Sequence, residues 1–526
     1  MIRVLDPATA IVRPDQEIGD TAYVSDRLLV RGDQPLQLDD RVAAVLKELG
    51  LGLRPHRRNG ERVLPRWRLR DRKIRIESEQ VVGLELHVVD PRGAPAPDAW
   101  TVLQQIRAAA PDVAPAFELV HVLFATTPLG GIGKGGSYVP GIGKGGSYVP
   151  GIGKGGSYVP GIGMGPDEFG VPGYGGKAPV ALVIADPSTT ARRLKRPPVV
   201  VMPDTGIGDH PWFPDEAVVG MSPSPPASLG VKIVGAPVAD RGPGVSSRLT
   251  GEFDRLAGHG TFIAGLVRQM SPEARLQSHA VMSSDGLVAE DDVIELLLGL
   301  LEAQLDALDA GDDAAMIDVL TLSFGCYHED LAEEDADPSV LTSTSFATVL
   351  RDLGRVGVLV VAGAGNDATA RPFVPAAFAG DVTAGNGDLP LVSVGSLNPN
   401  ASKVSLFSNG GSWVTTYRHG AAIVSALPRI QNASSQASAG VSGLDTLSAD
   451  EQRDVRAGKA PRPQDRATID LDDYTSGFGV WSGTSFAAPV LAGEFAHALA
   501  DLGSDATDLE SMLKRGWAAL SRVFAS

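Results

Sequence analysis

Hydrophobic and polar positions divide the chain into two long regions with regular patterns and a stretch between them without one. In the first region, residues 1–127, alternating runs predict strands and runs with a helical period predict helices. The middle stretch, residues 128–177, is rich in glycine and proline. In the third region, residues 178–526, unbroken apolar runs alternate with helical ones. We therefore expect two folded domains joined by a linker.

The first region predicts a small α+β domain. The expected strands and helices lie, in chain order, at residues 23–31, 41–49, 67–76, 81–89, 99–106 and 117–124. Asp39 and Asp98 are suitable residues to begin the two helices, and Gly50 is a suitable residue to end the first. The order strand, helix, strand, strand, helix, strand is the ferredoxin-like arrangement.

The third region predicts an α/β domain. Short unbroken apolar runs, such as those at 181–185, 199–204 and 358–363, are typical of parallel strands buried on both faces. Helical runs such as residues 293–308 separate them, which predicts a parallel sheet with helices on both faces. Residues 429–473 are polar and charged, and we expect them to form a surface insertion.

The middle stretch contains an internal repeat. The decapeptide GIGKGGSYVP occurs without change at 131–140, 141–150 and 151–160. A unit of this length and composition cannot bury a core of its own, so we expect an extended or flexible linker. The alternative is an array of binding sites.

Composition and charge narrow the possible partners. The chain has 526 residues, of which 43% are hydrophobic and 21% charged, as expected for globular domains. The net charge of −17 argues against binding to nucleic acid or to an anionic membrane. Cys326 is the single cysteine, so no intramolecular disulfide can form. No export signal and no apolar run of about 20 residues is evident, and we expect a cytoplasmic protein.

Four polar side chains stand at strand ends or helix starts of the third region. Asp204 ends the run VVVMPD, and Asn366 follows the run VVAGAG. His259 stands between two glycines at the start of one helical run, and Ser485 stands at the start of another. Because ligands of parallel α/β sheets bind where the strands end, we expect these side chains to share one crevice.

These residue types fit nucleophilic catalysis. A serine hydroxyl attacks efficiently only when a base removes its proton, and a third group must fix the tautomer of that base. Ser485, His259 and Asp204 supply these three parts. The amide of Asn366 can donate a hydrogen bond to a developing oxyanion, and the N-terminus of the helix at Ser485 favours negative charge.

The ordered motifs resemble those of the subtilisin family of serine proteases. They are DTG at 204–206, GHGTFIAG at 258–265 and GTSFAAP at 483–489, and the likeness covers the third region. The resemblance implies hydrolysis of peptide bonds by the triad Asp204, His259 and Ser485, with Asn366 in the oxyanion hole. It also implies a substrate site walled by Leu322, Ser323, Phe324, Gly325, Gly363, Ala364 and Gly365.

The first region resembles subtilisin propeptides, which assist folding and then inhibit by laying their C-terminal tail in the active cleft. The resemblance implies that residues 1–127 act as an intramolecular inhibitor. We expect residues 124–129 to lie beside residues 322–325, because an extended peptide can pair with an exposed strand.

Two alternatives to a serine endopeptidase remain open at this point. The first is a catalytically silent scaffold that keeps the fold, and the second is a serine esterase or a peptide ligase. We expect no cofactor and assign no metal, because no calcium-loop motif is present. Of the remaining side chains, we expect His328 to lie near the substrate strand and Cys326 to be packed, and we interpret Asp209 and His210 as loop residues.

Overall fold

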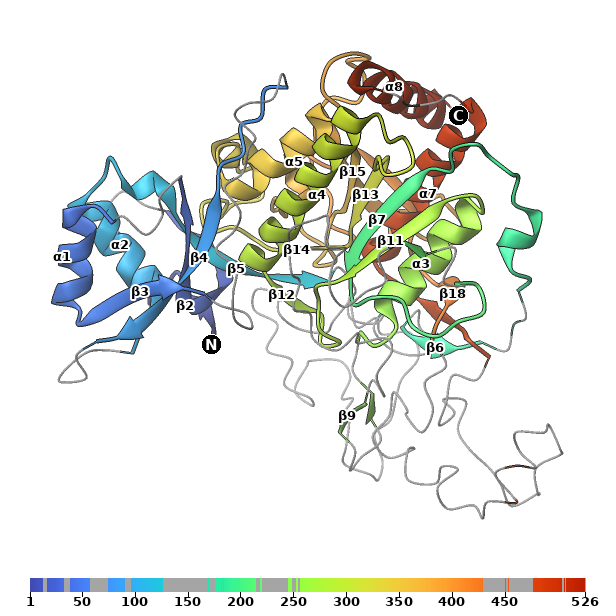
Figure 1. The fold of residues 1–526 in the computed structure, drawn as a ribbon. Coiled ribbons are helices and arrows are strands. Elements are labelled where there is room, and N and C mark those ends of the chain that lie inside the picture. Colours follow the sequence, from blue (N-terminus) through green and yellow to red (C-terminus); the bar gives the residue numbers. More distant parts are fainter. Residues whose placement is uncertain are drawn as a thin grey trace.

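The structure of the chain is a computed structural model. It describes residues 1–12, 17–32, 38–56, 74–89, 96–125, 184–213, 256–428, 476–503 and 508–525, with short pieces at 169, 176–180, 182, 218–219, 245–247, 252–253, 450, 453 and 506. Two lobes lie side by side, a small N-terminal domain and a larger C-terminal domain (Figure 1). The repeats at 131–160 and nearly all of 429–473 lie outside the described residues, so the predicted limits of the linker and the insertion stay predictions.

The N-terminal domain is an antiparallel sheet with two helices. Its elements are β1 (Ile2–Leu5), β2 (Thr21–Arg31), α1 (Asp40–Glu48), β3 (Leu51–Pro55), β4 (Val81–Val88), α2 (Ala99–Ala109) and β5 (Phe117–Ala125). The strand order β5-β2-β4-β3, with β1 paired to β2, confirms the predicted ferredoxin-like arrangement. Asp39 and Asp98 begin the two helices by accepting the backbone N–H groups of Arg41 and Thr101, as predicted.

The second strand of this domain lies at a different place from the one predicted. The second strand of the arrangement is β3, at Leu51–Pro55, whereas the described part of 67–76 belongs to no strand. Gly50 has a φ of 67°, which lets the chain reverse directly after α1 and pair Leu51 with Val88 of β4. The strand therefore begins as soon as the helix ends.

The C-terminal domain contains a seven-stranded sheet in the order β17-β16-β15-β13-β7-β11-β8, and all its neighbouring strands are parallel. The strands are β7 (Val199–Asp204), β8 (Val218–Val219), β11 (Arg275–Ala280), β13 (Val319–Leu322), β15 (Leu359–Gly363), β16 (Leu391–Leu397) and β17 (Thr416–His419). The predicted parallel α/β architecture is thus confirmed. The described residues of 181–185, a predicted strand, belong to no strand.

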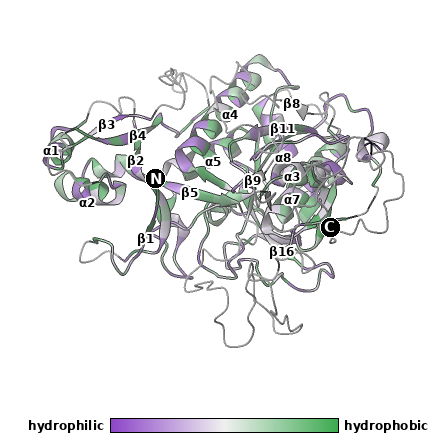
Figure 2. Ribbon diagram, turned by 90° about the horizontal axis from the view of Figure 1, so that it is seen from below, coloured by the Kyte–Doolittle hydropathy of each residue, from purple (hydrophilic) through white to green (hydrophobic). Residues whose placement is uncertain are grey.

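Helices cover both faces of this sheet. On one face lie α3 (His259–Met270) and α7 (Thr484–Leu502), with α8 (Leu509–Ala525) packed on α7; on the other lie α4 (Glu290–Ala310) and α5 (Ser345–Arg355). Hydrophobic and hydrophilic positions alternate along α4 and α5 (Figure 2), as expected of helices with one buried face. A small antiparallel sheet joins β18 (Ile423–Ala426), β19 (Phe478–Trp481) and β6 (Ala178–Pro179).

The N-terminal sheet is buried on both faces. Leu28 and Leu84 pack with α1 and α2 in the core of their own domain. Leu29, Val81 and Val120 point the other way and join the large core of the C-terminal domain, against α4. The two domains therefore share a continuous apolar contact.

The N-terminal sheet continues across the junction between the domains through β5. The end of β5 pairs on one side with β12 (Leu287–Ala289) and on the other with β14 (Phe324–Gly325), in both cases antiparallel. In Figure 1, β5 extends from the N-terminal lobe to the C-terminal lobe, where β12 and β14 flank it.

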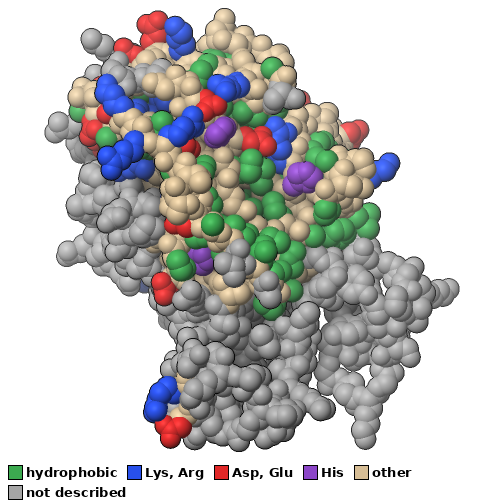
Figure 3. Space-filling model, turned by 90° about the vertical axis from the view of Figure 1, so that its right-hand side faces the viewer, with side chains coloured by type: hydrophobic (Ala, Val, Ile, Leu, Met, Phe, Trp, Pro, Cys, Tyr) green, Lys and Arg blue, Asp and Glu red, His purple; other side chains and the backbone are tan. Residues whose placement is uncertain are grey.

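The surface carries both signs of charge. On the face shown in Figure 3, Lys and Arg side chains lie mixed with Asp and Glu side chains and with apolar ones. No helix among the described residues has both the length and the hydropathy needed to span a membrane.

Candidate active site

Asp204 and His259 form a buried pair. Asp204 is the last residue of β7, and His259 is the first residue of α3. The Nδ1 atom of His259 lies 2.7 Å from Oδ1 of Asp204, and both side chains are almost completely buried. A carboxylate at Nδ1 holds the proton there and leaves Nε2 as the basic nitrogen. Among the described residues, Nε2 has no hydrogen-bond partner.

The threonines of two motifs lock the segments of this pair together. The hydroxyl of Thr205 accepts the N–H of Gly260 at 2.9 Å, and the hydroxyl of Thr261 accepts the N–H of Gly208 at 2.8 Å. Gly260 is required for this approach, because a Cβ atom there would lie 2.2 Å from the carbonyl oxygen of Gly206. These two hydrogen bonds hold the DTG and GHGT motifs together.

Ser485 lies in the first turn of α7, where backbone N–H groups point toward the site. Its hydroxyl donates to the carbonyl oxygen of Ser323 at 3.1 Å, and the hydroxyl of Ser323 donates to the carbonyl of Ser485 at 2.9 Å. The ring of His259 lies 5.4 Å, centroid to centroid, from that of Phe486, the next residue of the helix. No hydrogen bond joins His259 to Ser485 in this structure, so the hydroxyl must rotate to use the base.

The amide of Asn366 has a fixed orientation. Its oxygen accepts the N–H of Thr484 at 2.9 Å, while the hydroxyl of Thr484 accepts the N–H of Gly365 at 3.0 Å. The oxygen is therefore assigned by its donor, and the NH₂ group faces the other way. That NH₂ group is buried and has no partner among the described residues. It is a donor held in place for an acceptor that a ligand would supply.

The predicted substrate residues lie on both sides of Ser485. Leu322 ends β13, Ser323 contacts Ser485 directly, and Phe324 and Gly325 form β14. Gly363 ends β15, and Ala364 and Gly365 follow it, with Gly365 joined to Thr484. All seven of these residues are buried.

Three other side chains singled out from the sequence pack against neighbours of their own. Cys326 is buried and its backbone pairs with Val374, as expected of a packed residue. His210 packs in an aromatic cluster with Trp212 and Phe478. His328 lies against His121 of the N-terminal domain, with ring centroids 4.7 Å apart.

Sequence reasoning missed the reciprocal bonds of Ser323 and the role of the threonines. Lys177 was missed as well: its ammonium donates to the carbonyl of Ala257 at 3.0 Å and lies 4.6 Å from the ring centroid of Trp481, which in turn contacts His259. The two threonines belong to the motifs and could have been predicted from them. The sequence around Lys177 contains no pattern that predicts a position near Trp481.

Comparison with known proteins gives one family match. The sequence model of the subtilase family matches residues 199–514, more than half of the chain. A search of curated proteins finds no match. Among solved structures, fervidolysin from Fervidobacterium pennivorans, a keratinolytic enzyme related to subtilisin, is similar with a TM-score of 0.42 and 16% identity, over 96% of this chain and 62% of that one.

Two further solved structures are similar at comparable levels. A lanthipeptide protease has a TM-score of 0.35 and 17% identity, over 62% of this chain and 87% of that one. A cold adapted subtilisin-like serine proteinase has a TM-score of 0.33 and 18% identity, over 61% of this chain and 82% of that one.

Proposed function

The chain belongs to the subtilase family, and from this premise we propose that it is a serine endopeptidase that cleaves proteins or peptides through an acyl-enzyme. The observation that carries the proposal is the buried pair of Asp204 and His259. The ring of His259 lies beside the helix that bears Ser485, and its Nε2 has no hydrogen-bond partner among the described residues. Because Nε2 of His259 makes no hydrogen bond to the described residues, it can accept a proton from the serine.

The reaction follows from these positions. The hydroxyl of Ser485 turns from Ser323 toward His259, gives its proton to Nε2 and attacks the carbonyl carbon of the peptide. Asp204 stabilises the imidazolium that forms. The NH₂ group of Asn366 and the first turn of α7 stabilise the oxyanion. His259 then returns the proton to the leaving amine, and water releases the acyl group by the reverse sequence.

The test is covalent labelling with a fluorophosphonate, combined with peptide hydrolysis. Ser485→Ala is expected to abolish labelling and to lower kcat by about 10⁶-fold, the size of the loss in subtilisin itself. Ser482→Ala is the control, because its hydroxyl lies in the same segment but bonds to the N–H of Ala422.

Three outcomes would contradict the proposal. Labelling that persists in Ser485→Ala would place the nucleophile elsewhere. A wild-type chain that never labels, even after residues 1–127 are removed, would favour a silent scaffold. Hydrolysis of esters without hydrolysis of peptides would favour an esterase.

We further propose that the N-terminal domain inhibits this site. Phe124 and Ala125 pair with Gly325 and Phe324, in the segment predicted to bind substrate. On its other edge, β5 pairs with β12. A peptide substrate held by the same backbone groups would have to displace β5. Residues 126–129, predicted to continue across the cleft, lie outside the described residues.

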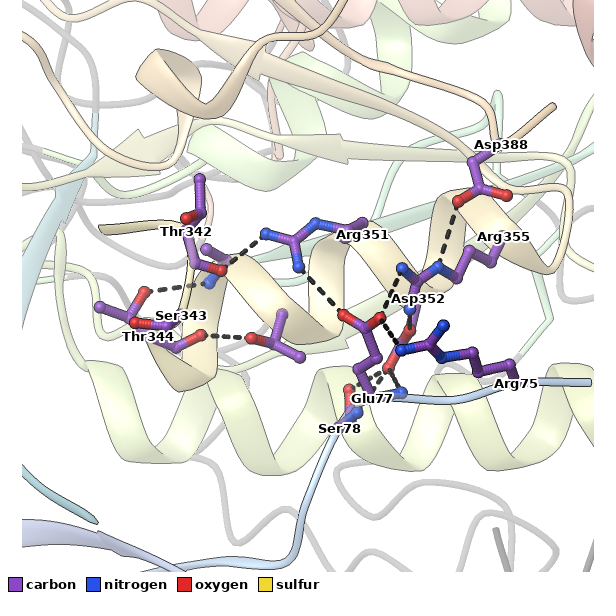
Figure 4. A network of polar contacts seen from close by, with 12 residues as sticks. Arg75, Glu77, Ser78, Thr342, Ser343, Thr344, Arg351, Asp352, Arg355 and Asp388 are labelled. Atoms are coloured by element: carbon purple, nitrogen blue, oxygen red, sulfur yellow. Dashed lines mark hydrogen bonds and ion pairs between the residues drawn. The ribbon is translucent and has the colours of Figure 1, made fainter. Parts of the chain in front are cut away.

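Polar contacts also support a docked inhibitor. Both oxygens of Asp291, on α4, accept from Nη1 of Arg27 at 2.8 Å. Arg371 donates to the carboxylate of Asp20 at 2.8 Å. A third contact, around Asp352 of α5, is the network of Figure 4. These contacts add specific anchors to the apolar contact between the N-terminal sheet and α4.

A cut in the linker tests the inhibition. A tethered inhibitor acts at an effective concentration of about a millimolar, which a cut removes. We expect hydrolysis of a peptide to be slow before a site introduced within 131–160 is cut, and to rise on dilution afterwards. Full activity in the uncut chain would contradict the proposal. Cutting an equivalent site placed after residue 526 is the control.

A further inference from the structure

A cluster of two histidines and two glutamates lies where the domains meet. The pairs Phe124 with Gly325 and Ala125 with Phe324 define the register of β5 with β14, and continuing this register places His121 opposite His328. The register of β5 with β12, in which Val122 pairs with Ala289, places His121 opposite Glu290 in the same way. His121 therefore lies between two segments of the C-terminal domain.

Both ring nitrogens of His121 face carboxylate oxygens. Nδ1 lies 2.6 Å from Oε2 of Glu290, and Nε2 lies 2.7 Å from Oε2 of Glu329. That oxygen of Glu329 is also 3.5 Å from Nδ1 of His328. His121, Glu290 and Glu329 are buried, and His328 is half-buried. One ligand atom from each of His121, His328 and Glu329 lies within 4.8 Å of the others.

We propose that His121, His328 and Glu329 bind a zinc-type divalent cation that joins the two domains. Two imidazoles and one carboxylate form a ligand set that suits Zn²⁺, whereas Ca²⁺ and Mg²⁺ prefer oxygen ligands alone. Ligand atoms about 2.0–2.1 Å from a tetrahedral metal are about 3.3 Å apart. The observed separations of 2.7 and 3.5 Å lie on either side of this value. The third separation, between the nitrogens of the two histidines, is at most 4.8 Å, so binding of the cation brings the two imidazoles closer together.

Glu290 supplies the partner that metal-bound histidines normally have. A histidine that binds a metal through one nitrogen usually donates its other N–H to a carboxylate, which fixes the ring. With the cation at Nε2, the Nδ1–H of His121 donates to Glu290 without any movement. Nδ1 of His328 now accepts the N–H of Asp330 at 3.1 Å, and coordination at Nδ1 exchanges this bond for the cation.

Charge also favours a cation. Without one, His121 must be an imidazolium to donate to both carboxylates, and the buried group carries one net negative charge. Arg371, whose guanidinium donates to the carbonyl of His328, is already bonded to Asp20 and to the carbonyl of Leu331. A divalent cation with neutral histidines balances Glu290 and Glu329. The fourth ligand is water or Asp330, whose Oδ2 is 3.9 Å from Nδ1 of His328.

The test is zinc binding to the full chain in the Ser485→Ala background, which prevents self-cleavage. Equilibrium dialysis against Zn²⁺ with elemental analysis is expected to give one tightly bound ion per chain. Co²⁺ in place of Zn²⁺ is expected to give visible absorption bands of tetrahedral intensity. Neither readout depends on catalysis, so a failure here is distinguishable from a failure of the proposed protease function.

Variants separate a built site from adventitious binding. His328→Asn, at a half-buried position, is expected to lower affinity by 100-fold or more, and Glu290→Gln by about 10- to 100-fold, because it alters only the partner of His121. His497→Asn is the control: this exposed histidine on α7 has a carboxylate 3.8 Å away but belongs to no metal-binding group found among the described residues. Absence of a stoichiometric ion, unchanged affinity in His328→Asn, or an equal loss in His497→Asn would each overturn the proposal.

Discussion

The carboxylate of Asp352 offers a test of domain docking that alters none of the proposed catalytic residues. Its Oδ2 accepts the N–H of Glu77 at 3.0 Å, the N–H of Ser78 at 2.7 Å and the hydroxyl of Ser78 at 2.6 Å. Its Oδ1 accepts from Arg355 at 2.8 Å, and the side chain is completely buried. Figure 4 shows these contacts at the centre of the network. The change to make is Asp352→Asn, which keeps the shape and removes the charge.

The expected magnitude follows from these bonds. A hydrogen bond to a charged group contributes about 1.5–3 kcal/mol, and the three that share Oδ2 are not additive. An asparagine must turn its NH₂ group toward the donors of residues 77–78 or toward Arg355, so at least one donor loses its acceptor. We expect docking of the N-terminal domain to weaken by about 2–4 kcal/mol, in line with losses of buried charged partners. This corresponds to a Kd about 30- to 700-fold higher.

The assay uses a nicked complex prepared from the folded full chain. The Ser485→Ala chain with a cleavage site within 131–160 is cut, and the Kd of the two fragments is measured. Asp388→Asn is the matched control, since Asp388 also bonds to Arg355, at 3.1 Å, but is half exposed and does not touch residues 77–78. We expect less than about a threefold change there. A small effect of Asp352→Asn, or equal effects of both changes, would refute this account of docking.

Three more predictions concern the catalytic domain. Asn366→Ala is expected to lower kcat by about 10²- to 10³-fold with little change in KM, because its NH₂ group meets charge present mainly in the transition state; a change confined to KM in steady-state kinetics would contradict this. Burial lowers the pKa of His279 to about 4, so the unfolded chain gains its proton first as the pH falls from about 6.5. The folded state therefore loses about 3 kcal/mol of its free energy of unfolding as the pH falls from about 6.5 to about 4. Urea unfolding at pH 7 and pH 4 should show a smaller difference in the free energy of unfolding for His279→Gln than for the wild type. Gly325→Ala would place a Cβ atom 2.3 Å from the carbonyl oxygen of Val374. We expect the free energy of unfolding to fall by about 1–3 kcal/mol, measured as a lower Tm. An unchanged Tm would show that the backbone of this strand moves to accommodate the methyl group.

Local signals in the sequence predicted much of the fold. Asp39 and Asp98 begin helices because their side chains accept nearby backbone N–H groups, which is a property of a few adjacent residues. Unbroken apolar runs predicted β7 and β15 because both faces of those strands are covered. The strand β3 was not predicted, because its five residues are too short to give a clear period. Its pairing with β4, a contact between segments distant in sequence, determines this strand.

The candidate site shows the same division. Motifs predicted which side chains meet at strand ends, since the carboxyl ends of parallel strands share one edge. The orientation of the Asn366 amide depends on Thr484, which is 118 residues away, and no local pattern encodes it. The contact of His121 with Glu329 spans 208 residues and needs the register of β5 against a strand of the other domain. Such contacts follow from tertiary structure alone.

The two-sided pairing of β5 also bears on the lifetime of the free C-terminal domain. When the N-terminal domain leaves, Leu287–Ala289 and Phe324–Gly325 both lose the strand between them. Unpaired strand edges are templates for association with other chains, and the slot they form accepts any extended segment of a neighbouring molecule. We therefore expect the docked N-terminal domain to protect these edges from association. We expect the released domain to lose solubility in a concentration-dependent way unless a peptide fills the gap between these two strands.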